Sequence, residues 1–172
     1  MRIAFVGGGH MTTSLVGGLR ARGTDPGAIV VSDPVPAQLE RLARDYGIAT
    51  ASDNASAVAG ADVVVLAVKP QDMAVAARAV AAALQHARPV IVSIAAGIRL
   101  ADLARWLGAG ATLVRTMPNR PALIGAGITA AYAPATVAAA ARARASAVLE
   151  PAGPVVWLDD EAQMDAVTAV SG

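Results

Sequence analysis

The chain has 172 residues, of which 55% are hydrophobic but only 3% aromatic, and it carries 14 basic against 13 acidic residues. This length suits one well-buried domain rather than two complete ones, and a core of Ala, Val, Leu and Ile suits helices packed on a parallel sheet. The balanced charge, without a basic block, argues against a nucleic-acid partner, and the absence of cysteine excludes disulfides, thiolate metal sites and a cysteine nucleophile.

No segment has the character of a membrane span or of a targeting peptide. The most strongly apolar stretch, residues 63–68, is far shorter than the roughly 20 residues that cross a bilayer. The first residues run directly into glycines and have neither the apolar length nor the cleavage site of a signal peptide. We therefore expect a cytoplasmic protein without a membrane partner.

Short β-type apolar runs alternate with longer helical patterns, which is typical of right-handed βαβ units. We predict strands at residues 3–6, 29–32, 48–50, 62–68, 89–94, 112–116, 127–132 and 155–158. We predict helices at residues 10–22, 70–85, 100–107 and 135–149, and from about 160 onward. A further helix is marked by Leu39, Leu42 and Tyr46 and ends at Gly47. Residues 117–121 are expected to form a rigid loop, because two prolines restrict the backbone there. The fold class is α/β, a Rossmann-type doubly wound, mostly parallel sheet with helices on both faces.

A glycine-rich segment separates the first predicted strand from the first helix. Gly7 permits a tight turn, Gly9 lets the backbone approach a pyrophosphate, and the following helix N-terminus offers free N–H donors. The segment therefore predicts a dinucleotide-binding loop, and the alternative is a glycine turn that serves only close packing. Thr12 stands at the third glycine position, so we expect helix and strand to approach less closely there.

Asp33 ends the second predicted strand. A carboxylate there can accept hydrogen bonds from the adenosine ribose and repel a 2'-phosphate, which favours NADH. The alternative is a simple turn formed with Pro34. The two histidines are distant in sequence and no acidic pair has ligand spacing, so we expect no metal site.

Four segments together resemble the pyrroline-5-carboxylate reductase family: residues 5–11 (FVGGGHM), 66–71 (LAVKPQ), 93–97 (SIAAG) and 117–119 (MPN). A fifth, residues 164–172 (MDAVTAVSG), resembles the family's Asp-Ala-Val-Thr helix and the start of its Ser-Gly-Ser-Gly-Pro-Ala-Tyr signature. The resemblance implies an NAD(P)H-dependent reductase that transfers a hydride to the imine carbon of 1-pyrroline-5-carboxylate and forms L-proline. Such chemistry needs alignment and a dry pocket, so binding residues are expected and no catalytic residue is assigned.

The resemblance also implies which residues bind. The expected cofactor residues are Gly7, Gly8, Gly9, His10, Met11, Thr12, Asp33, Pro34, Asn54, Ala67, Val68, Lys69, Pro70, Ile94, Ala95, Ala96 and Asn119. Glu161 is expected to approach the cationic form of the substrate, and the alternative is an acid that stabilises a helix start. For the Lys69 side chain, the alternative interpretation is that it only marks the end of a strand and the start of a helix. For Asn119, the alternative is a turn residue after Pro118. Arg120 stands where the family usually has Thr.

By the same resemblance, residues 1–158 form the dinucleotide-binding domain and residues 159–172 begin a C-terminal helical domain that serves dimerisation and substrate binding. We expect a homo-oligomer formed through that domain, and a chain that is a fragment, able to bind dinucleotide but poorly active alone. The expected cofactor is NADPH, with NADH as the alternative because of Asp33. The alternative functions are another NAD(P)-dependent reductase of this type, such as a hydroxyacid dehydrogenase or a deazaflavin-dependent NADP reductase, and a non-catalytic dinucleotide-binding module.

Overall fold

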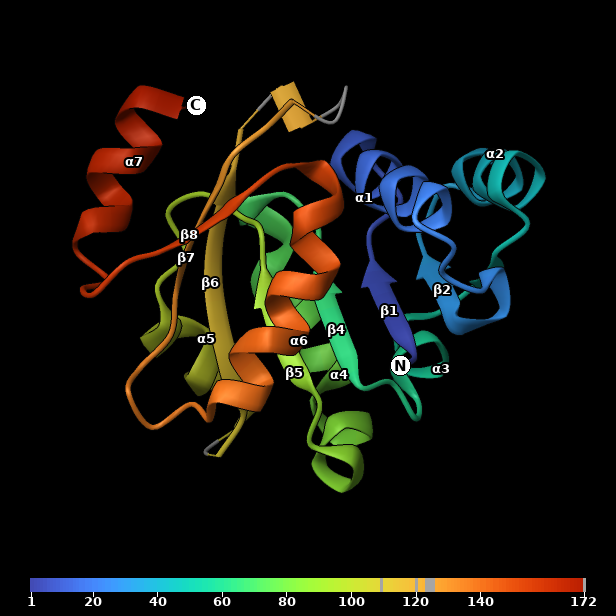
Figure 1. Cartoon of the computed structure of the whole chain (residues 1–172). Helices are drawn as coiled ribbons and strands as arrows, with labels where there is room; N and C mark the ends of the chain where they lie inside the picture. The colour runs from blue at the N-terminus through green and yellow to red at the C-terminus, as the bar shows by residue number, and fades with distance from the viewer. Residues whose placement is uncertain (109, 120, 123–125, 172) are drawn as a thin grey trace.

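A computed structural model of the chain describes residues 1–108, 110–119, 121–122 and 126–171, and the described strands form one eight-stranded sheet (Figure 1). The strands are β1 (Ile3–Val6), β2 (Ile29–Ser32), β3 (Ala49–Ala51), β4 (Val63–Leu66), β5 (Val90–Ser93), β6 (Thr112–Pro118), β7 (Thr129–Tyr132) and β8 (Val155–Trp157). The helices are α1 (His10–Ala21), α2 (Pro36–Tyr46), α3 (Asn54–Val58), α4 (Met73–Ala87), α5 (Leu100–Leu107), α6 (Ala139–Leu149) and α7 (Gln163–Ser171). Short 3-10 turns are η1 (Pro26–Ala28), η2 (Pro70–Asp72) and η4 (Glu150–Ala152).

The strand order confirms the predicted fold class. The sheet runs β3-β2-β1-β4-β5-β6-β7-β8, and all pairs from β3 to β6 are parallel. Only β7 runs antiparallel to its neighbour β6 among the described strands. Val6 pairs with Ser32 on one side and with Leu66 on the other, so β1, β2 and β4 end level with one another. In such a sheet the ligand site lies beyond these carboxyl ends.

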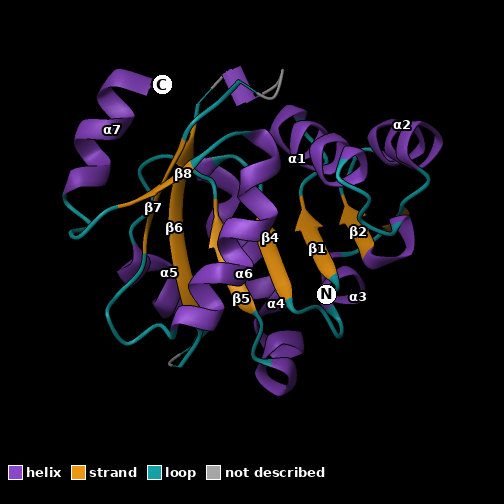
Figure 2. Ribbon diagram, viewed as in Figure 1, coloured by secondary structure: helices purple, strands orange, loops and turns teal. Residues whose placement is uncertain are grey.

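Helices cover both faces of the sheet, which explains why its central strands are continuous apolar runs (Figure 2). On one face, Phe5 and Val65 pack with Leu15 of α1, Leu42 of α2 and Leu149 of α6. On the other face, the alternate strand residues pack against α3, α4 and α5. Every residue of β1, β2, β4 and β5 is buried, so the sequence pattern and the two-sided packing agree.

Several element boundaries differ from the prediction. Met117 and Pro118 do not begin a loop but complete β6, where they pair with Ala130 and Thr129. Pro118 is the last residue of the strand, a position where the missing N–H interrupts no inner ladder bond. The helix predicted from residue 135 begins at Ala139, and the last helix begins three residues later than residue 160.

The short helix α3 was not predicted, because five residues are too few for a helical hydrophobic period. Its local signal is Asp53, whose carboxylate accepts a hydrogen bond of 2.8 Å from the Ser56 N–H. An aspartate three residues before a free N–H is a typical N-cap. The cap therefore fixes where α3 begins, beside the end of β2.

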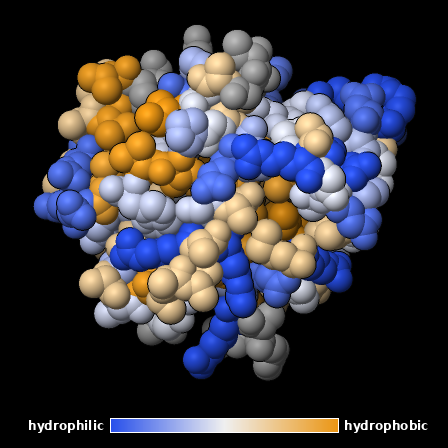
Figure 3. Space-filling model, in the orientation of Figure 1, coloured by the Kyte–Doolittle hydropathy of each residue, from blue (hydrophilic) through white to orange (hydrophobic). Residues whose placement is uncertain are grey.

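The last helix, α7, packs against β6 and β7 at one side of the sheet (Figure 1). Apolar side chains gather on the surface over this region, where Val170 is 87% exposed (Figure 3). The division of the chain at residues 158 and 159 stays a prediction. Along the described residues, no helix combines the length and the apolarity that a membrane crossing requires.

Candidate dinucleotide-binding site

The first glycine of the loop is required by the fold itself. Gly7 has a φ of +105°, and a Cβ atom there would lie 2.6 Å from the carbonyl oxygen of Ala67. Its N–H donates to the Ser32 carbonyl at 2.8 Å. Gly7 therefore lies where the ends of β1, β2 and β4 meet, and only glycine fits its conformation and its surroundings.

Gly9, the second glycine of the motif, is different, because packing among the described residues does not require it. Gly9 has a φ of −72°, and a Cβ added there would meet no heavy atom of the described residues within 4 Å. Gly9 is also the N-cap of α1, and no described side chain caps the first turn of that helix. An open approach to uncapped N–H groups at a helix start suits an anionic group such as a diphosphate.

Thr12 occupies the third glycine position of the motif and is buried there. Its side chain is fully buried, and its hydroxyl donates to the Gly7 carbonyl at 2.6 Å. The hydroxyl therefore ties the first turn of α1 back to the end of β1. This bond was not predicted, and its signal in the sequence is a Thr five residues after Gly7. His10 is exposed, and Met11 packs at the edge of the core.

Asp33 lies directly against the glycine loop. Its Oδ2 accepts a hydrogen bond of 2.6 Å from the Gly8 N–H, and its Oδ1 accepts one of 2.8 Å from the Val35 N–H. The bond to Val35 is the turn that the alternative interpretation described, with Pro34 exposed between the two residues. The bond to Gly8 places the same carboxylate beside the loop. The turn and a role at the ribose are therefore compatible.

The last residue of β2 and the residues after β3 meet beside the glycine loop. The Ser32 hydroxyl, which is 1% exposed, donates to Oδ1 of Asn54 at 2.8 Å. The hydrogen bond from the Ser56 N–H lowers the pKa of the Asp53 carboxyl below its ordinary value of 3.8. The carboxylate of Asp53 is therefore charged at neutral pH.

A cleft of about 600 Å³ lies in front of these residues. Its polar side is formed by Asp33, Ser52, Asp53 and Asn54, and the other side is mainly apolar, with Val68, Val75, Ala76 and Ala79 next to the carboxylate of Asp72. Gly7 and Pro34 also line it. This volume falls within the range of about 300–1,000 Å³ that is typical of small-molecule sites. One polar side and one apolar side suit a nucleoside, with hydroxyl groups at one side and a planar base at the other.

The other predicted cofactor residues follow β4, β5 and β6, whose parallel register brings their ends to one edge of the sheet. Ala67 and Val68 are half-buried, and Lys69 and Pro70 are exposed where η2 begins. Ile94 and Ala96 are half-buried beside the buried Ala95. The structure thus brings these predicted residues to the same edge of the sheet as the glycine loop.

Asn119 has a partner within its own loop. Its Oδ1 accepts a hydrogen bond of 2.9 Å from the Ile128 N–H, so the side chain shapes the segment after β6. Its contact with the cofactor stays a prediction. Arg120, next in the chain, lies outside the described residues.

Glu161 is held by a buried arginine that sequence reasoning missed. Its Oε1 accepts from the Leu100 N–H at 2.8 Å and from Nη1 of Arg115 at 3.2 Å. Arg115 is 2% exposed and also bonds Asp165 of α7 at 3.2 Å. The signal in the sequence is a single arginine within the apolar strand β6. Glu161 therefore joins α7 to α5 and β6, and its contact with a substrate stays a prediction.

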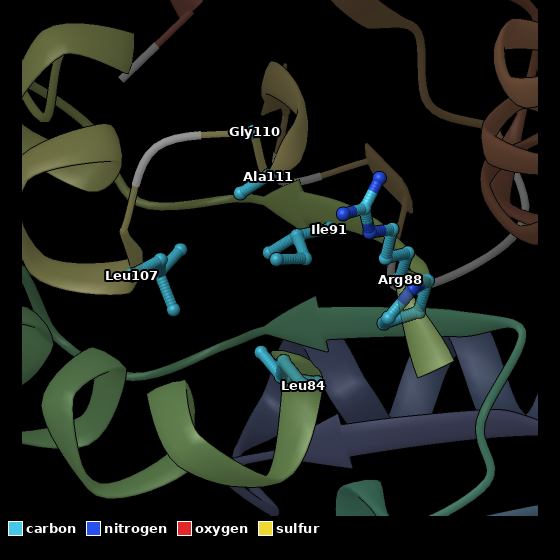
Figure 4. A pocket seen from close by; sticks show the side chains of 7 residues that line it. Leu84, Arg88, Ile91, Leu107, Gly110 and Ala111 are labelled. Carbon is cyan, nitrogen blue, oxygen red and sulfur yellow. The ribbon is translucent and has the colours of Figure 1, made fainter. Parts of the chain in front are cut away.

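A second, smaller hollow lies at the opposite edge of the sheet, between the ends of α4 and α5 (Figure 4). Leu84, Arg88, Ile91 and Leu107 are among the residues that line it. Its volume of about 80 Å³ is too small for a dinucleotide. Within the described ranges, no three His, Asp or Glu side chains form a group that could hold a metal.

Comparison with known proteins identifies the family. Residues 2–97 match the family described as NADP oxidoreductase, coenzyme F420-dependent. The chain is 52% identical over 171 residues to a pyrroline-5-carboxylate reductase from Pseudomonas aeruginosa, an alignment that covers 99% of this chain and 62% of that protein. The chain thus spans less than two thirds of the length of this relative.

Solved structures agree with this comparison. A pyrroline-5-carboxylate reductase from Coxiella burnetii matches with a TM-score of 0.96 and 34% identity, over 99% of this chain and 63% of that one. A pyrroline carboxylate reductase from Plasmodium falciparum, described with NADP bound, shares the fold with a TM-score of 0.86 and 22% identity, over 100% of this chain and 62% of that one. The resemblance predicted from the motifs is confirmed, and the chain belongs to the NADP oxidoreductase, coenzyme F420-dependent, family, with similarity to pyrroline-5-carboxylate reductases over 99% of its length.

Proposed function

We propose that this chain is the dinucleotide-binding part of a reductase that converts 1-pyrroline-5-carboxylate to L-proline with NAD(P)H. The observation that carries the proposal is Gly9, whose missing side chain serves no packing need among the described residues but leaves the start of α1 open. The similarity to pyrroline-5-carboxylate reductases supports the substrate. It continues beyond residue 97, where the family match ends, and so favours this reductase over others of the same fold.

The residues of the site fit a nicotinamide dinucleotide. The backbone of residues 7–12 would hold the diphosphate, and the Asp33 carboxylate would accept hydrogen bonds from the adenosine ribose. The segment after β4 would lie along the cofactor, and the segment after β5 would border the nicotinamide half, which supplies the hydride when it is bound. The described part of the chain would bind and orient the cofactor and exclude water from it. Most of the catalytic effect would come from this alignment.

Several finer expectations belong to this proposal. Homo-oligomer formation, the role of Glu161 and the cytoplasmic location stay predictions. The choice between NADPH, which the resemblance favours, and NADH, which Asp33 favours, depends on the residues around the ribose 2'-position.

Dinucleotide binding can be tested with Gly9→Ala in the 172-residue chain. We expect the variant to unfold at the same temperature as the wild type but to bind both NADH and NADPH at least about tenfold more weakly, because the methyl group blocks the approach to the helix start. Gly27→Ala is the matched control, since its Cβ would meet only the Asp25 carboxylate at ordinary distances of 3.5 Å and more. Unchanged affinity in Gly9→Ala, measured by titration calorimetry, would contradict the proposal.

The substrate requires a separate assay. In the full-length protein encoded by the gene, oxidation of NAD(P)H should depend on added 1-pyrroline-5-carboxylate. One L-proline should form for each NAD(P)H that is oxidised. A protein that binds dinucleotide but forms no proline would instead support the non-catalytic alternative.

A further inference from the structure

The cleft beside the glycine loop is acidic. Three carboxylates line it, those of Asp33, Asp53 and Asp72, and its described lining contains no Lys or Arg. Binding of a 2'-phosphate by this fold normally depends on a nearby arginine. Within this lining, the charged side chains that such a phosphate would meet are all negative.

The Asp33 side chain cannot rotate away from the expected position of the ribose without losing hydrogen bonds to the backbone. Both of its oxygens accept backbone hydrogen bonds, from Gly8 at 2.6 Å and from Val35 at 2.8 Å. Rotation of the side chain would leave the part-buried Gly8 N–H without this partner, which is unfavourable where water has limited access, whereas water can replace the exposed bond from Val35. Each carboxylate oxygen keeps a second lone pair, so Asp33 can still accept bonds from ribose hydroxyls in its present position.

The polar and basic side chains closest to Asp33 in the chain already have hydrogen-bond partners. The buried Ser32 hydroxyl donates to Asn54. The Arg41 guanidinium donates at 2.9 Å to the Thr13 hydroxyl and at 2.9 Å to the Gln38 amide oxygen. Neither side chain is part of the described lining of the cleft.

We propose that this cleft selects NADH over NADPH, and that Asp33 is the residue that determines the choice. The inference rests on the proposed function, since it concerns the same cofactor site. It reverses the NADPH expectation taken from the family resemblance. Asp53 and Asp72 are exposed, so solvent and salt screen their charges, and the half-buried Asp33 carries most of the effect.

The test is the affinity of the 172-residue chain for NADH and for NADPH, measured by nicotinamide fluorescence at low and high salt. We expect the wild type to bind NADH at least about tenfold more tightly than NADPH, with a smaller ratio at high salt. In Asp33→Asn, which keeps the shape and one oxygen acceptor, the ratio should fall below about threefold, chiefly through tighter NADPH binding. Asp45→Asn on α2 is the control, because it makes the same change in net charge outside the cleft.

The outcomes are distinguishable. Equal or tighter binding of NADPH by the wild type would overturn the inference and leave the proposed function intact. An NADH preference that persists unchanged in Asp33→Asn would also overturn it, whatever the double variant Asp53→Asn, Asp72→Asn shows. Binding of neither dinucleotide would overturn the proposed function and the inference together.

Discussion

The ion pairs of Arg115 allow a quantitative prediction about how α7 is attached. The Arg115 side chain is 3% exposed, whereas its partners Glu161 and Asp165 are 25% and 57% exposed. Removing one partner of a fully buried pair costs about 3–5 kcal/mol, and an exposed pair contributes about 0–1 kcal/mol. The two carboxylates should therefore differ in importance, although both lie 3.2 Å from the same guanidinium.

We expect Glu161→Ala to lower the free energy of unfolding by about 2 kcal/mol. This value lies below the fully buried range because Asp165 remains as a partner and because Glu161 itself is partly solvated. It includes about 1 kcal/mol for the lost bond from the Leu100 N–H. Asp165→Ala should cost only about 0.5 kcal/mol, because that carboxylate is mostly in water.

Urea unfolding followed by both circular dichroism and tryptophan fluorescence measures these differences, and coincident transitions of the two probes establish that unfolding is two-state. The double variant Arg115→Met, Glu161→Ala should be more stable than Glu161→Ala alone, because it no longer leaves a poorly paired buried cation. If Asp165→Ala were as destabilising as Glu161→Ala, or if the double variant were the less stable one, the reasoning from burial would be refuted.

Two further predictions concern the residues around the loop. Gly7→Ala should lower the free energy of unfolding by about 3 kcal/mol or more, because it combines a φ of +105° with a Cβ only 2.6 Å from the Ala67 carbonyl oxygen, and thermal unfolding should show this loss in contrast to Gly9→Ala. The hydrogen bond from Ser56 lowers the pKa of Asp53 below 3.8, so its stabilising effect is present above pH 3.8 and is lost as the pH falls through the folded-state pKa. The stability difference between the wild type and Asp53→Ala should therefore shrink on acidification, and a difference that grew instead would show that the cap has another origin.

Much of the fold could be predicted from the sequence, because its signals are local. The buried strands β1, β2, β4 and β5 are short apolar runs, and α5 has a regular apolar stripe, so hydrophobic pattern located each of them closely. The pattern failed where length or context decided the outcome. Helix α3 is too short to show a period, and Pro118 belongs to β6 only because β7 returns beside it.

The candidate site could be predicted in part for the same reason. The order of strand, glycine loop and helix identified residues 7–12, since that motif is contiguous in the chain. The partners of the site residues are distant in sequence and could not be identified. Arg115 is 46 residues from Glu161, and the bond between Gly8 and Asp33 spans 25 residues.

The sequence by itself determined the doubly wound sheet, the position of the glycine loop and the resemblance to a reductase family, because these depend on residues that are neighbours along the chain. Only the tertiary structure decided which glycine the fold requires, where the Asp33 carboxylate points, and that Glu161 pairs with a buried arginine. The physical reason is that free space, hydrogen bonding and charge pairing are properties of atoms brought together by folding, and the spacing of residues along the chain does not specify them.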